Sequence, residues 1–442
     1  MENAKINRSP FKLKFPYLFI LLGFLIIILV GSLLLMLPFA THNGIAFIDA
    51  LFVSTSAVCI TGLSSVVVID TFTLFGQIVV MLLIQIGGLG FVTVMTAVLT
   101  LFGVKLGLSE KFLMGETLGE SRLNVRTFLG RALLITFVIE AFGVILNLIA
   151  LRNDYSGGRL FFVSLFQAIS AFNNAGFDLF GATSMQIYAG DENPLLLFST
   201  ALLTVLGGLG YIVINEVVTL RKSPRHLSTH SKIVLTITPI LLLGGGLGIY
   251  LSEWGGVCFG DAMFMSAMAR TCGFSCCDLS TWKNSSLMLY DFLMFVGAGP
   301  ASTGGGIKCT TLFVLVVAIV SFMRGKQPVA FQRKIPARTV ARAMLITVMT
   351  LMCVFAVSTG VAAFEPQTPT AHIVLETVSA FANVGSSAGI TTGLETGSKA
   401  LLCLAMFFGR LGCMTVLMVL RRNWNRNEDE SIRYVDADVI VG

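Results

Sequence analysis

The chain has 442 residues, of which 55% are apolar and only 12% are charged, and its mean hydropathy is +0.85. Ordinary soluble domains carry roughly 25% charged residues, so this composition excludes a soluble enzyme, a disordered chain and a nucleic-acid-binding protein. Uncharged runs of more than 20 residues separate the charged clusters, and a run of that length can cross a bilayer as a helix. The sequence therefore predicts a multi-pass membrane protein.

Eight long apolar stretches are predicted to cross the membrane as helices. In chain order they are Phe15–Ala40, Phe72–Val104, Ala132–Leu151, Pro194–Leu220, Ile233–Ser252, Ser286–Met323, Ala343–Phe364 and Lys399–Leu420. The first follows a basic tail, but its 26 uncharged residues exceed the apolar core of a signal peptide. We therefore expect this first helix to be retained.

Four shorter semi-apolar stretches lie between alternate spans. They cover approximately 45–61, 160–175, 258–272 and 371–384. Segments of about 15 residues are too short to cross a bilayer, and irregular backbone at membrane depth survives only where protein shields it or water reaches it. We therefore predict four re-entrant segments.

The distribution of positive charge predicts the orientation. The N-terminal tail, the segments 105–131, 221–232 and 324–342, and the residues after Leu420 together hold 23 of the 30 basic residues. Because cytoplasmic loops carry this excess, we predict a plasma (inner) membrane protein with both termini in the cytoplasm and re-entrant segments that enter from outside. Carboxylates gather on the outer side, where they either belong to solvated loops or concentrate cations at a pore mouth.

The unit of helix, re-entrant segment and helix occurs four times. The predicted repeats are 15–104, 132–220, 231–323 and 343–420, between cytoplasmic tails 1–14 and 421–442. The re-entrant segments align on Gly62, Gly176, Gly273 and Gly385. These glycines are 114, 97 and 112 residues apart, and a Ser-Ala pair precedes three of them by six and five residues but stands one residue earlier in the third repeat. The second helices also match, since QIGGLG at 85–90 resembles VLGGLG at 205–210.

Four matched turns with permissive glycines can surround one axis and present backbone carbonyls to a dehydrated cation. The alternative is that the glycines only allow close packing of membrane helices. That alternative explains one or two glycines better than it explains four at matched positions.

Five motifs carry a resemblance to a known family. They are ITGL at 60–63, NNAGF at 173–177, ARTCGF at 269–274, STGGGIK at 302–308 and FFGRLG at 407–412. On these motifs the chain resembles the Trk/Ktr/HKT superfamily of potassium transporters over about residues 15–420, and it is most similar to the Ktr type. The resemblance implies an all-α membrane protein whose four helix–pore loop–helix repeats form a single-chain pseudo-tetrameric ion pore.

The resemblance also implies a potassium selectivity filter made by the backbone of the four re-entrant segments. The implied ion-binding residues are Ile60, Thr61, Gly62, Asn174, Ala175, Gly176, Thr271, Cys272, Gly273, Asn383, Val384 and Gly385. Plant relatives that favour sodium have serine at the first filter glycine, so Gly62 favours potassium. The chain departs from the family pattern at Pro300, Ser386 and Cys413.

The glycine-rich segment Gly297–Lys308 interrupts the sixth predicted span. Glycine and proline are the poorest helix formers, so we predict an intramembrane loop rather than a simple kink. The resemblance makes this loop a gate below the filter, with Arg410 beside it. The implied gate residues are Gly297, Gly299, Gly304, Gly305, Gly306, Lys308 and Arg410.

Other charged residues within apolar segments receive structural interpretations. Arg270 is predicted to hold the third filter loop by donating to carbonyls or to a nearby carboxylate. Asp49 and Asp261 are predicted to cap the short re-entrant helices. For Glu140 and Glu216, which lie within spans, a coupling-ion or partner role stays open.

No constellation for covalent chemistry is present in the sequence, so no enzyme activity is predicted. The cluster Cys272, Cys276 and Cys277 lacks a histidine, and we predict no metal centre there. No nucleotide motif and no organic cofactor are expected on this chain. The resemblance implies that the transported ion is K⁺, and Na⁺ stays open as an activator.

The cytoplasmic segments are too short to form a domain of their own. By the resemblance, the partners are a cytoplasmic ring of nucleotide-binding regulatory subunits, a second copy of the chain in a homodimer, and membrane lipid, but no nucleic acid. The alternative function is a secondary cation symporter with alternating access, which would be built from inverted repeats. The four repeats here all start on the cytoplasmic side and are therefore parallel.

Overall fold

The computed structural model describes residues 10–89, 125–190, 192–219, 227–300 and 302–412. Within these ranges the regular elements are helices, apart from a hairpin of two short strands, β1 (Val329–Ala330) and β2 (Arg333–Lys334). The all-α prediction is therefore confirmed. The predicted tail 421–442, most of the basic segment 105–131, Cys413 and the ends of several predicted spans lie outside the described residues.

Each repeat contains a long first helix, a short buried helix that we call the central helix, and a second helix. The first helices are α1 (Pro10–Leu35), α7 (Val125–Ala150), α11 (Thr229–Ser252) and α15 (Ala337–Phe364). The central helices are α2 (Phe47–Cys59), α8 (Gly157–Phe172), α12 (Phe259–Ala269) and α16 (Thr370–Ala382). The second helices are α4 (Leu74–Leu89), α9 (Pro194–Leu209) with α10 (Tyr211–Thr219), α13 (Asn284–Phe295) with α14 (Cys309–Met323), and α17 (Thr396–Leu411).

Short helical turns follow the central helices before the chain returns. They are α3 (Val68–Thr71), η1 (Ser184–Tyr188), η3 (Leu279–Thr281) and η4 (Thr391–Gly393). Every repeat therefore places a short turn between its central helix and its second helix.

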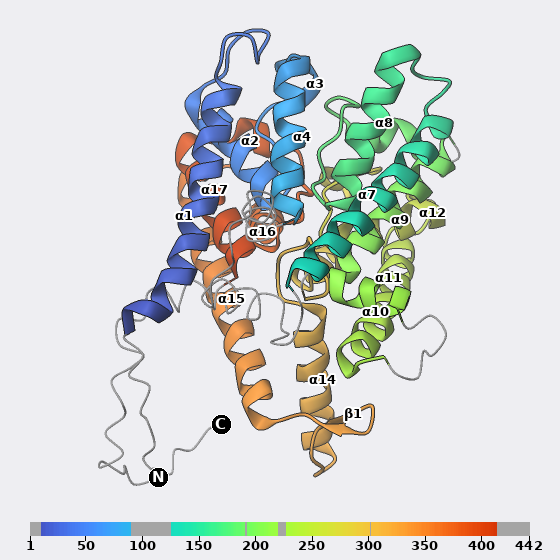
Figure 1. The fold of residues 1–442 in the computed structure, drawn as a ribbon, viewed down its shortest axis with the longest axis vertical. Helices are drawn as coiled ribbons and strands as arrows, with labels where there is room; N and C mark the ends of the chain where they lie inside the picture. Colours follow the sequence, from blue (N-terminus) through green and yellow to red (C-terminus); the bar gives the residue numbers. More distant parts are fainter. Residues whose placement is uncertain (1–9, 90–124, 191, 220–226, 301, 413–442) are drawn as a thin grey trace.

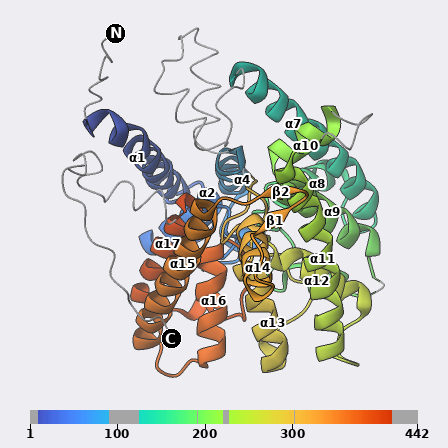
Figure 2. The same ribbon diagram turned by 90° about the horizontal axis from the view of Figure 1, so that it is seen from below.

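The four repeats follow one another around a common centre, as Figures 1 and 2 show. Within each repeat the central helix packs against the first and the second helix. Between repeats the second helix packs on the central helix of the next repeat, in the pairs α4 with α8, α9 with α12, α13 with α16, and α17 with α2. The last pair closes the ring.

Small and polar residues hold the central helices close to the first helices, as is common where no hydrophobic drive exists between helices in lipid. The hydroxyl of Ser54 donates to the carbonyl of Ile28 over 2.7 Å, and the hydroxyl of Ser266 donates to the carbonyl of Leu242 over 2.8 Å. A Cβ atom at Gly31, on α1, would lie 2.5 Å from the Ser54 hydroxyl oxygen. The missing side chain of Gly31 thus makes room for the Ser54 bond.

One predicted span is more broken than the sequence suggests. Within the described ranges, three single helices are long and apolar enough to cross a membrane, Gly130–Ala150, Thr229–Ser252 and Ala337–Phe364, and α9 with α10 makes a fourth if the bent pair is one span. The prediction of a continuous helix over Pro194–Leu220 is wrong. Its two halves meet at 93° because Gly210 has φ 90° and ψ 145°, a conformation that only glycine adopts readily.

The sixth predicted span is also interrupted, here as the sequence predicts. The helix stops at Phe295 and resumes at Cys309. Beyond the break, α14 and α15 run side by side at the lower end of the molecule in Figure 1, next to β1. Buried Val314 on α14 belongs to a small apolar cluster there with Ala330, Ile335 and Ala343.

The predicted caps of the central helices are wrong in detail. Asp49 and Asp261 lie in the first turns of α2 and α12, but the N-cap positions are Ala46 and Cys258. The carboxylate of Asp261 instead accepts from the backbone N–H of Gly190 at 3.0 and 3.1 Å. The carboxylate of Asp49 pairs with Lys399 Nζ at 2.8 Å, which joins the fourth repeat to the first.

We predict that Lys399→Met destabilises the protein by roughly 2 kcal/mol. Losing one member of a fully buried pair costs about 3–5 kcal/mol, and the partial exposure of this pair, 11% and 19% of the two side chains, lowers that cost. The melting temperature of the detergent-solubilised protein, followed by size-exclusion chromatography, measures the change.

The matched control is Lys283→Met. Lys283 Nζ lies 3.9 Å from Glu253, but 59% of the lysine side chain is exposed, so we expect little change. Equal losses in both variants would contradict a special role for the Asp49–Lys399 pair.

Candidate functional site

Four glycines, one from each repeat, meet around one axis. A Cβ atom at Gly62 would lie 2.6 Å from the carbonyl oxygen of Ala175, and one at Gly176 would lie 2.5 Å from the nitrogen of Gly273. A Cβ atom at Gly273 would lie 2.6 Å from the carbonyl carbon of Gly385, and one at Gly385 would lie 2.8 Å from the Cα atom of Gly62. Each glycine therefore abuts the next repeat in a closed ring, and the ring has room for backbone only.

The backbone just before the ring has the same unusual conformation in three repeats. The residues two positions before the glycines have positive φ angles, Ile60 58°, Asn174 59°, Asn383 53° and Thr271 114°. A residue other than glycine in such a region costs about 1–3 kcal/mol and persists only where its surroundings hold it. We call the three-residue segments that end at the ring glycines the four strands. They are held in place by contacts that their central helices and neighbours supply.

Backbone hydrogen bonds from the central helices supply part of that hold. The N–H groups of Thr61, Ala175 and Val384 each donate, over 2.8, 2.8 and 2.9 Å, to the carbonyl five residues back. In the third repeat the N–H of Cys272 donates over 2.8 Å to the carbonyl of Met268, four residues back. The different turn agrees with the one-residue shift of the Ser-Ala pair in that repeat.

Serine side chains add a second contact in only two repeats. The N–H of Gly62 donates to the hydroxyl of Ser56 over 3.0 Å, and the N–H of Gly385 donates to the hydroxyl of Ser379 over 2.9 Å. The hydroxyl of Ser170 has no hydrogen-bond partner among the described residues, and that of Ser266 bonds to α11 instead. The sequence shows the serines, but only the structure shows which of them hold a glycine.

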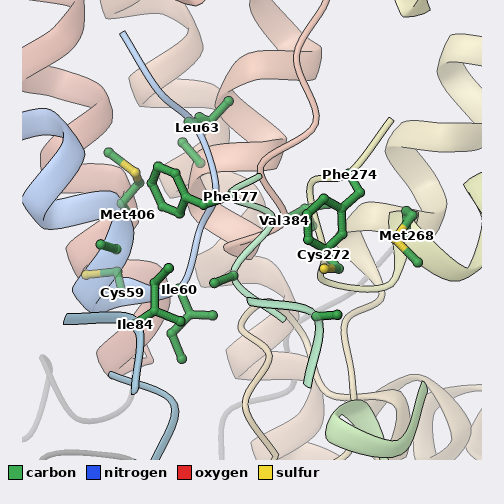
Figure 3. Packing of buried hydrophobic residues seen from close by; sticks show 14 of the residues in the cluster. Cys59, Ile60, Leu63, Ile84, Phe177, Met268, Cys272, Phe274, Val384 and Met406 are labelled. Atoms are coloured by element: carbon green, nitrogen blue, oxygen red, sulfur yellow. The ribbon is translucent and has the colours of Figure 1, made fainter. Parts of the chain in front are cut away.

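A cavity of about 450 Å³ lies on one side of the ring. It is lined by the four glycines and by residues that follow them, including the carboxylates Asp178 and Asp278. Figure 3 shows apolar side chains from all four repeats, among them Ile60, Phe177, Phe274 and Val384, each within two residues of a ring glycine in the sequence. Phe177, Phe274 and Val384 are buried, so they belong to the packing around the strands. We call this side of the ring the cavity side.

On the opposite side, the second helices approach the central helices through glycines. Cβ atoms at Gly87, Gly207 and Gly409 would clash with the carbonyls of Val58, Phe172 and Phe381, respectively. Each of these carbonyls lies four residues before a ring glycine. The three second helices thus support the ring at equivalent points, and the matched glycine motifs of the sequence have a packing role as well.

The third repeat differs, because residues 296–300 and 302–308 form an irregular loop at this point. The N–H of Gly297 donates to the carbonyl of Ile307 over 2.9 Å, and the N–H of Cys309 donates to the carbonyl of Ala298 over 3.2 Å, which closes the base of the loop. A Cβ atom at Gly304 would lie 2.5 Å from the Thr271 hydroxyl oxygen. The loop therefore packs directly against residues that precede the ring glycines, opposite the cavity.

The loop also contacts other repeats. The N–H of Gly299 donates to the carbonyl of Gly208 over 2.9 Å, and a Cβ atom at Gly305 would lie 2.7 Å from the carbonyl oxygen of Ala382. The loop thus lies across the axis and touches the second, third and fourth repeats. A Cβ atom at Gly306 would lie 3.3 Å from the Cβ atom of Ala382.

Arg410 joins the loop to the first repeat. Its guanidinium donates to the carbonyl of Thr303 in the loop and to the carbonyl of Gly87 at the end of α4. Lys308 donates to the carbonyl of Gly304 and so ties the loop to its own end. The structure brings Arg410 and the glycine-rich segment together, as the family resemblance implies.

Side chains also connect neighbouring strands. The amide of Asn174 donates to the hydroxyl of Thr271 over 2.8 Å, and the amide of Asn383 donates to the hydroxyl of Thr61 over 2.9 Å. The sequence offers no signal for these pairs, which are far apart in the chain. Ser386, one of the departures from the family pattern, bonds to the hydroxyl of Tyr290 at 2.7 Å.

The remaining charged residues have specific partners. Arg270 donates to the carbonyl of Thr238 over 3.2 Å, so the expected carbonyl contact is present. Glu216 accepts from Ser228 at the start of α11, and Glu376 accepts from Ser387 and Thr391 behind the fourth strand. Among the described residues no group of histidines, cysteines and carboxylates could hold a metal ion.

The family model described as "TrkH: Cation transport protein" matches residues 4–234 and 255–428 of this chain. The chain belongs to the TrkH cation transport family. This assignment agrees with the resemblance that the sequence motifs show.

Named relatives of this TrkH-family chain cover almost its whole length. Ktr system potassium uptake protein B of Bacillus subtilis is 36% identical over 433 residues, which are 95% of this chain and 95% of that protein. The protein of the same name from Vibrio alginolyticus is 37% identical, over 96% of this chain and 94% of its own. Potassium/sodium uptake protein NtpJ of Enterococcus hirae is 33% identical, over 97% of each chain.

A solved structure shares the fold. The crystal structure of the potassium transporter TrkH from Vibrio parahaemolyticus superimposes with a TM-score of 0.75 and covers 96% of this chain and 88% of that chain. Sequence identity between them is 18%, so this comparison supports the fold alone.

We predict that Ser56→Ala and Ser379→Ala each reduce selectivity among monovalent cations. Either change leaves a ring glycine N–H without its acceptor, at a cost of about 1 kcal/mol per bond. Ser170→Ala removes a hydroxyl with no partner among the described residues and should leave selectivity unchanged. Reversal potentials under two-cation gradients measure the difference, and equal behaviour of all three variants would contradict the assignment.

Proposed function

We propose that this chain mediates potassium uptake across the plasma (inner) membrane through a channel-like pore along the axis of the glycine ring. The names of the Bacillus and Vibrio relatives support potassium as the ion. The single observation that carries the proposal is the closed ring of Gly62, Gly176, Gly273 and Gly385, where only backbone fits.

The ring suits a dehydrated cation because backbone carbonyls can replace its hydration shell. The proposed filter consists of the three residues that end at each ring glycine, Ile60–Gly62, Asn174–Gly176, Thr271–Gly273 and Asn383–Gly385. Their strained backbone and their hydrogen bonds to the central helices support a fixed geometry. The carboxylates that line the cavity would concentrate cations at its mouth.

The membrane potential would drive the ion inward, because one elementary charge gains about 2.3 kcal/mol per 100 mV. The Enterococcus relative is named a potassium/sodium uptake protein. For the present chain, Na⁺ as an activator rests on the family resemblance alone. The four parallel repeats around one axis favour this pore over the alternating-access symporter.

The loop 297–308 is proposed as the gate. It lies across the axis against residues that precede the ring glycines, and its glycines fit where side chains would clash. Arg410 would hold the loop closed through Thr303 and Gly87, and its charge would oppose cations below the filter.

Regulation and assembly are proposed from the same resemblance. Both termini and the basic segments 105–131, 221–232 and 324–342 would face the cytoplasm. There they would dock a ring of nucleotide-binding regulatory subunits, while the chain forms a homodimer in the lipid bilayer. The Ktr system named for two relatives supports a partner subunit.

Ion flux into proteoliposomes tests the function. We expect potassium uptake that follows an imposed potential, at a rate that added regulatory subunit and nucleotide alter. Strict coupling of uptake to a second ion, with no current in its absence, would support the alternating-access alternative instead.

We predict that Gly62→Ser lowers the potassium-to-sodium permeability ratio by about tenfold, which corresponds to roughly 1.4 kcal/mol. The added side chain would crowd the carbonyl of Ala175, and Gly62 has φ 95°, which strains any other residue. Gly244→Ser is the control, because Gly244 has open space around it. Unchanged selectivity in Gly62→Ser would remove Gly62 from the filter.

We predict that Arg410→Ala raises potassium flux several-fold, because it releases Thr303 and removes a positive charge below the filter. Deletion of the loop core, Ser302–Gly306, should raise flux further. Arg152→Ala, in the exposed turn that follows α7, is the control and should have wild-type flux. If folded Arg410→Ala and loop-deletion proteins conduct less than the parent, the loop is not a barrier.

A further inference from the structure

The four filter strands are held in two different ways. In the first and fourth repeats a serine hydroxyl of the central helix accepts from the ring glycine, as described for Ser56 and Ser379. The second and third repeats lack that bond, since Ser170 has no partner among the described residues and Ser266 bonds elsewhere. Their strands need another anchor.

In these two repeats the residue three positions before the ring glycine supplies that anchor. In the four repeats this residue is Cys59, Asn173, Arg270 and Ala382. Only the second and third repeats have a polar side chain there, and each contacts the first helix of its own repeat. Asn173 Nδ2 lies 3.0 Å from Glu140 Oε1 on α7, and Arg270 Nη1 lies 3.2 Å from the Thr238 carbonyl oxygen on α11.

Glu140 is the centre of the anchor in the second repeat. Its carboxyl group also accepts from Gln85 Nε2 over 3.3 Å, and Asn173 Nδ2 lies 2.9 Å from Gln85 Oε1. A Cβ atom at Gly88 would clash with the Asn173 side-chain oxygen, so the missing side chain of Gly88 makes room for this cluster. Three helices, α4, α7 and α8, therefore converge on one buried carboxyl group.

Burying a carboxyl group in an apolar helix costs free energy, which favourable contacts must offset. Glu140 is 4% exposed and makes no salt bridge within the described residues, so its hydrogen bonds to two amides are what balance its burial. Asn173 ends α8 and precedes Asn174, whose left-handed conformation starts the second filter strand. Asn174 in turn donates to Thr271 of the third strand.

We propose that Glu140 is a positioning residue that fixes the second filter strand through Asn173 and thereby contributes to cation specificity. It takes the place that a serine hydroxyl holds in the first and fourth repeats. Its Oε1 accepts from the Asn173 amide and its Oε2 accepts from Gln85, so the Asn173 amide stays oriented with its nitrogen toward α7 and α4. This inference rests on the proposed function, because it assumes that the strands form the filter.

The test compares Glu140→Leu and Glu140→Gln with matched changes at Glu216, another carboxyl group within a predicted span. Glu216 bonds to Ser228 at the start of α11, away from the ring. Leucine removes both acceptors, whereas glutamine keeps one oxygen for Asn173. We expect a several-fold fall in the potassium-to-sodium permeability ratio for Glu140→Leu, a smaller fall for Glu140→Gln, and no change for Glu216→Leu or Glu216→Gln.

Reversal potentials in proteoliposomes with opposing K⁺ and Na⁺ gradients give the ratio independently of how much protein is active. A merely structural role would lower the amount of folded protein and leave the ratio of the remaining pores unchanged, which would overturn the inference. If Glu140→Leu does not fold, Glu140→Gln and Gln85→Met decide, and wild-type ratios in both would overturn it. A wild-type protein without potassium selectivity would instead refute the proposed function.

Discussion

The close approach of four backbones at Gly62, Gly176, Gly273 and Gly385 is the constraint on which the rest of the structure depends. Each glycine lies so near the next repeat that a single methyl group would collide with neighbouring backbone. Such an approach needs four short helices that stop at the same depth and four strands that leave them in strained conformations. Strain of this kind persists only where packing and hydrogen bonds hold it.

The ring arrangement of the helices meets that requirement. Each second helix packs on the central helix of its own repeat and on that of the next, so every strand is braced from two sides. The glycines Gly87, Gly207 and Gly409 allow this contact directly at the carbonyl ends of the central helices. The Asp49–Lys399 pair adds an electrostatic bond where the last repeat meets the first.

The fourfold pattern is broken at specific points, and these are the points of functional interest. In the third repeat a loop follows the second helix, at the point where the other second helices carry Gly87, Gly207 and Gly409, and the loop lies across the axis. At the position equivalent to Gly88 and Gly208, the fourth repeat carries Arg410, which holds that loop. Serine hydroxyls hold the first and fourth strands, whereas contacts with the first helices, the one to Glu140 among them, hold the second and third. A symmetric scaffold thus carries an asymmetric site.

The sequence by itself determined the all-α membrane class, the four repeats, the ring glycines and the interrupted sixth span. These features depend on composition, hydropathy and spacing along the chain, which act locally or repeat at matched positions. The prediction of the loop and of Arg410 beside it drew on the same regularity, together with the family resemblance.

Only the tertiary structure decided which polar groups meet. Asp49 lies in the first turn of α2 and pairs with Lys399, 350 residues later, whose amino group lies within reach of its carboxylate. The bend at Gly210 cannot be predicted from the apolar sequence around it. Whether a glycine continues a helix or breaks it depends on what packs against it. Likewise, Glu140 and Asn173 are ordinary residues in the sequence and become partners only where α7 and α8 pack together. Hydrogen bonds form between groups that lie close together in space. The order of residues along the chain does not show which groups those are.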